Sequence, residues 1–148
     1  MSNQFHKLSK HYLKKADLKY RKNLGQYFTP RDIREHLLSQ LPRIDSPKIL
    51  DPANGTGEFL LSARDYFNAP ELHGWEIDKK LVELSRKIIP SAKILCVDTL
   101  QRDYTEKYDF VIGNPPYFEF KPEMEIKRKF RDVIKGRANI FSMFIKMG

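Results

Sequence analysis

The chain has 148 residues, about the length of one domain, and its 41% hydrophobic and 12% aromatic residues suffice for a folded core. No apolar run is long enough for a membrane span or a secretory signal, so we expect a cytoplasmic protein with no membrane partner. Cys96 is the single cysteine, and the four histidines lie at no zinc-ligand spacing from it. We therefore expect no internal disulfide and no metal site, with Cys96 as a small core residue.

The net charge of +8 is distributed unevenly along the chain. Residues 1–22 carry seven Lys or Arg against one Asp, and residues 121–137 carry seven against three acids. Residues 23–120 carry twelve bases and fifteen acids, so the middle of the chain is mildly acidic. This distribution favours flanks that contact nucleic-acid phosphates and a core that binds a small molecule. Two solvated basic faces are the alternative.

Helical spacing of apolar residues predicts a basic amphipathic helix from Phe5 to Tyr20. A second helix is predicted to begin with Thr29 as its N-cap and Pro30 as its first residue, and to run to about Leu41. The residues that we expect this helix to bury are Ile33, Leu37 and Leu38.

From residue 48 onward, short apolar strands alternate with helical segments. The predicted strands are Lys48–Asp51, Leu72–Ile77, Ala92–Val97 and Tyr108–Ile112, and the predicted helices between them are Glu58–Phe67 and Asp78–Ile89. Such alternation is typical of parallel βαβ units with right-handed crossovers. The sequence therefore predicts an α/β fold with a doubly wound, mostly parallel sheet and helices on both faces. Apolar segments 126–133 and 139–147 follow with no further strand, so we expect the sheet to lack its last strands.

Ligands of doubly wound sheets bind beyond the carboxyl ends of the strands, and the first of these ends carries a glycine turn. In the turn Asp51-Pro-Ala-Asn-Gly-Thr-Gly57, glycine allows the backbone to approach a ligand, and the following helix offers free N–H groups. The turn is not a P-loop because no lysine follows, and Leu60 stands where a dinucleotide-binding turn has its third glycine. The candidate cofactor-binding residues here are Asp51, Ala53, Gly55 and Gly57.

Acidic residues stand at the next two predicted strand ends. Glu76 follows the glycine turn by about 20 residues, the spacing at which a carboxylate accepts the hydroxyls of a ribose. Asp98 can accept from an exocyclic amine, and Ile77 can pack on the face of an adenine. Together these three residues indicate a nucleoside pocket.

The fourth strand end, Asn114-Pro115-Pro116-Tyr117, indicates the chemistry. The prolines stiffen the backbone and lack N–H donors, so the Asn114 side-chain oxygen and the Pro115 carbonyl become fixed acceptors. Two acceptors suit an NH2 group, and they draw the lone pair of a conjugated nitrogen toward an electrophile. The Tyr117 ring can stack on the planar group that carries the amine, as expected for a base flipped out of a duplex.

These motifs resemble those of the class I methyltransferases that use S-adenosylmethionine, specifically the N6-adenine DNA methyltransferases. The glycine turn is similar to the Asp-Pro-Ala-Cys-Gly-Ser-Gly cofactor motif of that family, with Asn54 and Thr56 as departures. The segment Asn114–Tyr117 looks like its catalytic motif, in which Asn114 also borders the cofactor. The segment Gly136–Phe144 resembles the part of such enzymes that follows.

A further likeness lies ahead of the glycine turn. The segment Gly25–Pro30 is similar to the N-terminal motif that closes over the methionine part of the cofactor in this family. The resemblance therefore adds Tyr27 and Thr29 to the candidate cofactor-binding residues.

The order of the motifs resembles the gamma subgroup, because the glycine turn begins 63 residues before Asn114 (114 minus 51). In that subgroup a target recognition domain follows the catalytic domain. The basic N-terminal helix at 1–22 lies outside the resemblance. The resemblance implies a partial catalytic domain at 23–148 and a recognition domain on a missing C-terminal portion or a companion chain. The uncovered edge of the fourth strand also makes self-association an expectation.

The resemblance implies methyl transfer from S-adenosylmethionine to the exocyclic N6 amine of a flipped adenine in double-stranded DNA, in a restriction-modification system. Protein glutamine N5 methyltransferases of the release-factor type remain an alternative, since they resemble the same turn and Asn-Pro-Pro-Tyr. RNA adenine methyltransferases are a second alternative, and a non-catalytic fragment that binds cofactor or DNA is a third. The segment Gly25–Pro30 and the basic flanks favour a DNA enzyme over the protein glutamine methyltransferase.

Overall fold

Four parallel strands form the central sheet of the protein, whose computed structural model describes residues 4–19, 26–102, 107–134 and 136–147. In chain order the strands are β1 (Lys48–Asp51), β2 (Glu71–Glu76), β3 (Lys93–Cys96) and β4 (Phe110–Val111), and they lie side by side as β3-β2-β1-β4. From β1 to β3, each strand lies beside the one before it, whereas β4 lies on the other side of β1. The topological switch point, where such sheets bind ligands, therefore lies between β1 and β4. The predicted α/β class and parallel sheet are confirmed.

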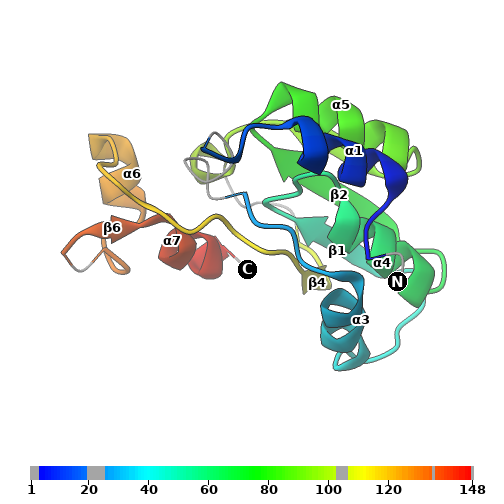
Figure 1. Ribbon diagram of the computed structural model, residues 1–148. Helices are drawn as coiled ribbons and strands as arrows, with labels where there is room; N and C mark the ends of the chain where they lie inside the picture. Colours follow the sequence, from blue (N-terminus) through cyan, green and yellow to red (C-terminus); the bar gives the residue numbers. More distant parts are fainter. Residues whose placement is uncertain (1–3, 20–25, 103–106, 135, 148) are drawn as a thin grey trace.

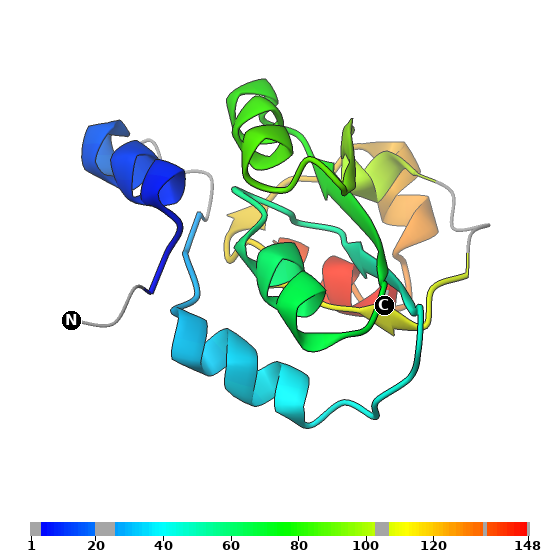
Figure 2. The ribbon, with the colours of Figure 1, turned by 90° about the vertical axis from the view of Figure 1, so that its right-hand side faces the viewer.

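Helices cover one side of this sheet, and the C-terminal part of the chain lies beyond the carboxyl ends of its strands (Figures 1 and 2). One side carries α3 (Arg31–Ser39), α4 (Glu58–Tyr66) and α5 (Lys79–Ile88), and α1 (Lys7–Lys15) lies beside α5. Beyond the carboxyl ends of the strands lie α6 (Met124–Lys129) and α7 (Ile140–Met147), with the antiparallel pair β5 (Glu119–Phe120) and β6 (Ala138–Asn139). A short 3-10 helix, η1 (Thr99–Gln101), follows β3. No helix among the described residues is both long and apolar enough to cross a bilayer.

Two apolar clusters hold these elements together. The main core joins the sheet to α3, α4 and α5. Its most buried members are Leu38, Ile49, Leu60, Ala63, Val82 and Ile89. The second cluster joins η1 to the C-terminal segment, and its members are Leu100, Ile126, Phe130, Ala138, Ile140, Met143 and Phe144. The second cluster therefore places the C-terminal segment beside the carboxyl ends of the strands.

The first predicted helix is shorter than its apolar pattern suggested. It begins at Lys7, because the ring of His6 accepts from the N–H of Leu8 at 3.3 Å and caps it. It ends at Lys15, since Ala16 has an extended backbone (ψ 130°). Tyr20, the predicted end, lies outside the described residues.

The predicted N-cap of the second helix is wrong. Pro30, not Thr29, is the residue before the helix, and it makes no side-chain cap. Instead, the side-chain oxygen of Gln4 accepts from the N–H of Arg31 at 2.7 Å. Gln4, near the start of the chain, thus caps the helix in place of the predicted Thr29.

The buried face of α3 also differs from the prediction. Leu38 is buried as expected, but Ile33 and Leu37 are about half exposed, and Arg34 is buried in their place. Arg34 and Leu38 are four residues apart and share one helix face, and the charge of Arg34 is paired with Glu58 on α4.

Two predictions at the sheet margins are also corrected. Cys96 is exposed rather than in the core, because it ends β3, the strand at one edge of the sheet. The predicted strand Tyr108–Ile112 is reduced to the two residues of β4.

Candidate active site

A pocket of about 300 Å³ opens at the carboxyl ends of the four parallel strands. Its lining is mainly apolar with a few polar groups, as is typical of small-molecule sites. The predicted site residues that line it are Tyr27, Thr29, Asp51, Ala53, Gly55, Glu76, Ile77, Asp98, Asn114 and Pro116. Gly57, Pro115 and Tyr117 do not line it. Four strand ends and the segment before α3 are thus brought to one cavity.

The glycine turn between β1 and α4 is held by backbone hydrogen bonds. The N–H of Asn54 donates to the carbonyl of Trp75 at 2.9 Å, and the N–H of Gly57 donates to the carbonyl of Asn54 at 2.7 Å. Gly57 has a left-handed φ of 85°, and a Cβ there would lie 2.5 Å from Ser85 Oγ on α5. Its lack of a side chain allows α4 to begin against α5, so Gly57 shapes the turn from behind the pocket.

Glu76 ends β2 with its carboxylate directed at the glycine turn. One oxygen accepts from the N–H of Gly55 at 2.8 Å, and the other accepts from the N–H of Asp78 at 2.9 Å. Burial raises the pKa of Glu76 above its ordinary value, and these backbone donors oppose the shift. A carboxylate has about four lone-pair sites, so both fixed oxygens can still accept from hydroxyl donors.

Asp51 is the most enclosed acidic group of the pocket, with 2% of its surface exposed. Its Oδ1 accepts from the N–H of Ala53 at 3.0 Å. Burial raises the pKa of Asp51 to about 7, and the nearby charge of Glu76 adds to the increase. Gly113 passes so close that a Cβ there would lie 2.5 Å from Oδ1, which explains the glycine between β4 and Asn114.

Asp98 and Ile77 border the pocket beyond β3 and β2. Asp98 caps η1, because its Oδ1 accepts from the N–H of Leu100 at 2.9 Å. The Ile77 side chain is 64% exposed, which leaves a large apolar group at the rim. An exposed aliphatic group beside a fixed carboxylate can pack on a planar ring while the carboxylate binds its polar edge.

Asn114 joins two sequence motifs that lie 87 residues apart. Its side-chain Nδ2 donates to the carbonyl of Tyr27 at 3.2 Å. This bond occupies the donor side of the amide and keeps Oδ1 as an acceptor. The end of β4 is thereby connected to the segment before α3.

Tyr117 lies outside the pocket lining and is half exposed. Its ring stacks on Phe141 with centroids 5.0 Å apart at an interplanar angle of 19°. The Tyr27 ring meets it edge to face at 6.3 Å. An aromatic group that is held by two neighbours and still half open is suited to stacking on a further ring.

Two small polar residues of the glycine turn are buried with unsatisfied oxygens. Thr56 Oγ1 lines the pocket region and has no hydrogen-bond partner among the described residues, and neither has Asn54 Oδ1. A buried unpaired oxygen costs about 1 to 3 kcal/mol. A polar ligand that reaches Thr56 recovers this energy, so the turn fits a bound cofactor with hydrogen-bonding groups. In the same described ranges, no group of three or more His, Cys, Asp or Glu is arranged to hold a metal ion.

Residues 5–146 match the protein family described as N-6 DNA Methylase. The chain belongs to the N-6 DNA methylase family. The family resemblance that we identified from the sequence motifs is thereby confirmed.

Two curated Type II methyltransferases are similar to this chain. The Type II methyltransferase M.CvrRI of Paramecium bursaria Chlorella virus XZ-6E is 37% identical over 140 residues, which covers 92% of this chain and 35% of that protein. The Type II methyltransferase M.AccI of Acinetobacter calcoaceticus is 26% identical over 148 residues, which covers 93% of this chain and 27% of that protein. The chain spans about a third of the length of these relatives.

A solved structure shares the fold of this chain. A Listeria monocytogenes protein described as a class I S-adenosylmethionine-dependent methyltransferase superposes with a TM-score of 0.73 at 20% identity. The match covers 95% of this chain and 46% of that one. The Rossmann-like class I methyltransferase fold, present here in part, is thereby confirmed.

Several residues that line the pocket were not among the site residues that the sequence predicted. Four of them come from the C-terminal side: Phe118, Phe120, Ile140 and Phe144. Ile140 and Phe144 are four residues apart on α7, so their helical spacing was a signal of a shared apolar face. Arg34 and Glu58 were also missed, because a charged residue on a helix gives no sign of burial.

Proposed function

We propose that this chain provides the catalytic site of an enzyme that transfers a methyl group from S-adenosylmethionine to the exocyclic N6 amine of a flipped adenine in DNA. The observation that carries the proposal is that Glu76 and Asn114 line one pocket at the switch point of the sheet. One residue suits a ribose and the other an amine, so a nucleoside cofactor and an amino substrate can meet there. The Type II methyltransferases among its relatives support a place in a restriction-modification system.

The pocket residues divide into groups that suit the parts of the cofactor. Glu76 would accept from the ribose hydroxyls, Asp98 from the adenine amine, and Ile77 would pack on the adenine face. Asp51 and Thr56 offer polar groups beside the glycine turn. When bound, S-adenosylmethionine supplies an electrophilic methyl group on a sulfonium.

The end of β4 would prepare the substrate amine. Asn114 Oδ1 and the Pro115 carbonyl would each accept one hydrogen of the NH2 group, which moves its lone pair out of conjugation with the ring. The nitrogen would then bond to the methyl carbon as the carbon–sulfur bond of the cofactor breaks, and the excess proton would leave to solvent. Tyr117 would stack on the extruded base and hold it in line.

The ribose assignment predicts a large effect of Glu76→Ala on cofactor binding. The variant loses hydrogen bonds to a charged acceptor, so we expect affinity for S-adenosylmethionine to fall by roughly 1 to 3 kcal/mol in titration calorimetry. Glu83→Ala, which removes an exposed carboxylate of α5 outside the pocket, is the matched control and should bind as the wild type does. Equal affinity of both variants contradicts the assignment.

We propose double-stranded DNA as the partner of the two basic flanks. Lys127 and Arg128 are exposed on α6 and have no acidic residue beside them in sequence. DNA affinity should fall at least tenfold between about 50 and 200 mM salt and should be similar for duplexes of different sequence. Fluorescence anisotropy measures this dependence.

Substitution of the two α6 residues tests whether the flank is responsible for the salt dependence. The double variant Lys127→Gln and Arg128→Gln should bind DNA more weakly and with a smaller salt slope. The control replaces Lys79 and Lys80, two exposed lysines of the middle region, in the same way. An equal loss in both pairs shows that net charge, not the flank, is responsible.

The outer edge of β4 has no strand partner among the described residues. Exposed strand edges pair with further chain, which supports self-association or a companion segment at this edge. Light scattering of the purified chain should give a mass above that of one copy. A strictly monomeric chain contradicts self-association.

A further inference from the structure

One wall of the pocket is the segment of residues 26–29, which we call the wall segment. All four of its residues line the pocket, and none belongs to a helix or strand. A segment without its own hydrogen-bond ladder keeps its position only through contacts with other parts of the chain. The source of those contacts therefore decides whether the pocket is closed on this side.

Aromatic residues from the start of the chain contact two of the wall residues. The hydroxyl of Tyr12 donates to Gln26 Oε1 at 2.9 Å. The rings of Phe5 and Tyr12 each lie 6.2 Å from the ring of Phe28, with Phe5 edge to face. Residues 4–16, which we call the N-terminal segment, thus pack against the wall segment from outside the pocket.

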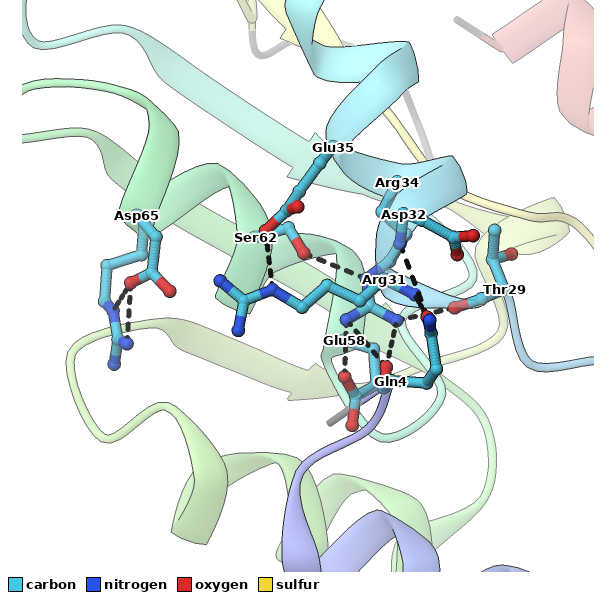
Figure 3. Close-up of polar contacts among 10 residues, drawn as sticks. Gln4, Thr29, Arg31, Asp32, Arg34, Glu35, Glu58, Ser62 and Asp65 are labelled. Atoms are coloured by element: carbon cyan, nitrogen blue, oxygen red, sulfur yellow. Dashed lines mark hydrogen bonds and ion pairs between the residues drawn. The ribbon is translucent and has the colours of Figure 1, made fainter. Parts of the chain in front are cut away.

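A buried arginine holds a third wall residue. Arg34 has 2% of its side chain exposed, and its Nη1 donates to the carbonyl of Thr29 at 2.5 Å (Figure 3). The same guanidinium donates to Glu58 Oε2 at 2.8 Å and to Ser62 Oγ at 2.9 Å, both on α4. Because the guanidinium is planar and rigid, these bonds fix Thr29 relative to α4.

The N-terminal segment is attached to the same buried group. The carbonyl of Gln4 accepts from Arg34 Nη1 at 3.4 Å, and the Phe5 ring lies 5.8 Å from the guanidinium. The N–H of His6 donates to Glu58 Oε1 at 2.8 Å. The Gln4 side chain caps α3 (Figure 3). Residues 4–6 therefore lie between the starts of α3 and α4 and lead directly into the contacts with the wall segment.

We propose that the N-terminal segment is a functional part of the cofactor pocket, because it holds the wall segment in place through Phe5 and Tyr12. Both act as positioning residues, since they contact the wall and not the cavity. The inference rests on the proposed cofactor and gives the basic helix α1 a role besides contact with phosphates. Loosening the wall lowers the fraction of molecules with a closed pocket, and the apparent affinity falls with that fraction.

The sheet order indicates which part of a ligand the wall segment affects. The wall is connected to Asn114 beyond β4 through the carbonyl of Tyr27, whereas Glu76 and Asp98 follow β2 and β3 on the opposite side of β1. A ligand consisting only of the nucleoside would be held by Glu76 and Asp98, away from the wall. A ligand that extends from the nucleoside toward β4 depends on the wall as well.

The test compares two ligands in the full chain, S-adenosylhomocysteine and adenosine. Trp75 is the only tryptophan and lines the pocket, so its fluorescence reports binding, and calorimetry provides a second measurement. In the double variant Phe5→Ala and Tyr12→Phe, we expect the Kd for S-adenosylhomocysteine to rise roughly tenfold. The Kd for adenosine should change by less than about twofold. Tyr12→Phe alone keeps the ring in place and should raise the Kd for S-adenosylhomocysteine about threefold, which preserves the test if the double variant does not fold.

Lys14→Ala, an exposed change on α1, is the matched control and should leave both dissociation constants unchanged. Unchanged binding of S-adenosylhomocysteine in the Phe5 and Tyr12 variants overturns the inference. Equal weakening of both ligands also overturns it, since this indicates a general loss of structure. A wild-type chain that binds neither ligand contradicts the proposed function itself.

Discussion

Asn114→Ala is expected to slow methyl transfer by about 100-fold or more while cofactor binding persists. Removing one of the two acceptors of the amine leaves its lone pair in conjugation, and loss of one such oriented group costs about that factor. The measurement is single-turnover transfer from labelled S-adenosylmethionine to duplex DNA by the protein that carries this chain, with cofactor affinity measured in parallel. Asn68→Ala, an exposed change in the loop before β2, is the control.

The parallel measurement of cofactor affinity decides whether Asn114 acts in the transfer step or only supports the pocket. Its Nδ2 also donates to the carbonyl of Tyr27, so the substitution removes one contact of the pocket wall. A few-fold loss of cofactor affinity is consistent with that contact. Loss of cofactor affinity as large as the loss of rate would instead indicate collapse of the β4 end, and would contradict a role in the transfer step.

The stability of the protein is expected to fall as the pH rises from about 4 to about 7, owing to Asp51. Its pKa is about 7 in the folded chain and 3.8 as the ordinary value, because burial disfavours the carboxylate. Between these pH values the folded state binds a proton that the unfolded state has lost, so the free energy of unfolding decreases as the pH increases. The total decrease in the free energy of unfolding is about 4 kcal/mol, and it is complete once the pH exceeds the folded pKa. Glu76, whose pKa is also raised, acts in the same direction.

Asp51→Asn removes the titration while keeping an oxygen to accept from the N–H of Ala53. Denaturant unfolding of both proteins at pH 5 and pH 8 measures the effect. Between these pH values the wild type should lose about 2 to 3 kcal/mol more than the variant. Asp65→Asn on the exposed side of α4 is the control and should keep the wild-type slope. A wild-type slope in Asp51→Asn contradicts the assignment of the buried proton.

The sheet and most of the pocket were predictable because their signals are local. Alternating apolar strands and helices placed β1 to β3 within a residue or two, and the glycine turn marked the end of β1. Since parallel strands end at one edge, Glu76, Asp98 and Asn114 were expected near one another. Their common pocket follows from this rule of topology.

Features that depend on distant partners were not predictable from local patterns. Burial of Arg34 requires Glu58, which lies 24 residues away, and the cap of α3 comes from Gln4, 27 residues before it. The stacking of Phe141 on Tyr117 likewise depends on how the C-terminal segment folds back. Gly57 was assigned to the cofactor, but its contact with Ser85 is visible only once α4 and α5 are packed.

The most direct test of the proposed function identifies the methylated atom. The protein that carries this chain is incubated with labelled S-adenosylmethionine and duplex DNA, RNA or a protein with an accessible glutamine, and each product is digested and separated by mass spectrometry. We expect the label in N6-methyldeoxyadenosine from DNA, lost in Asn114→Ala. Label on cytosine, on RNA alone or on a glutamine side chain contradicts the proposed reaction.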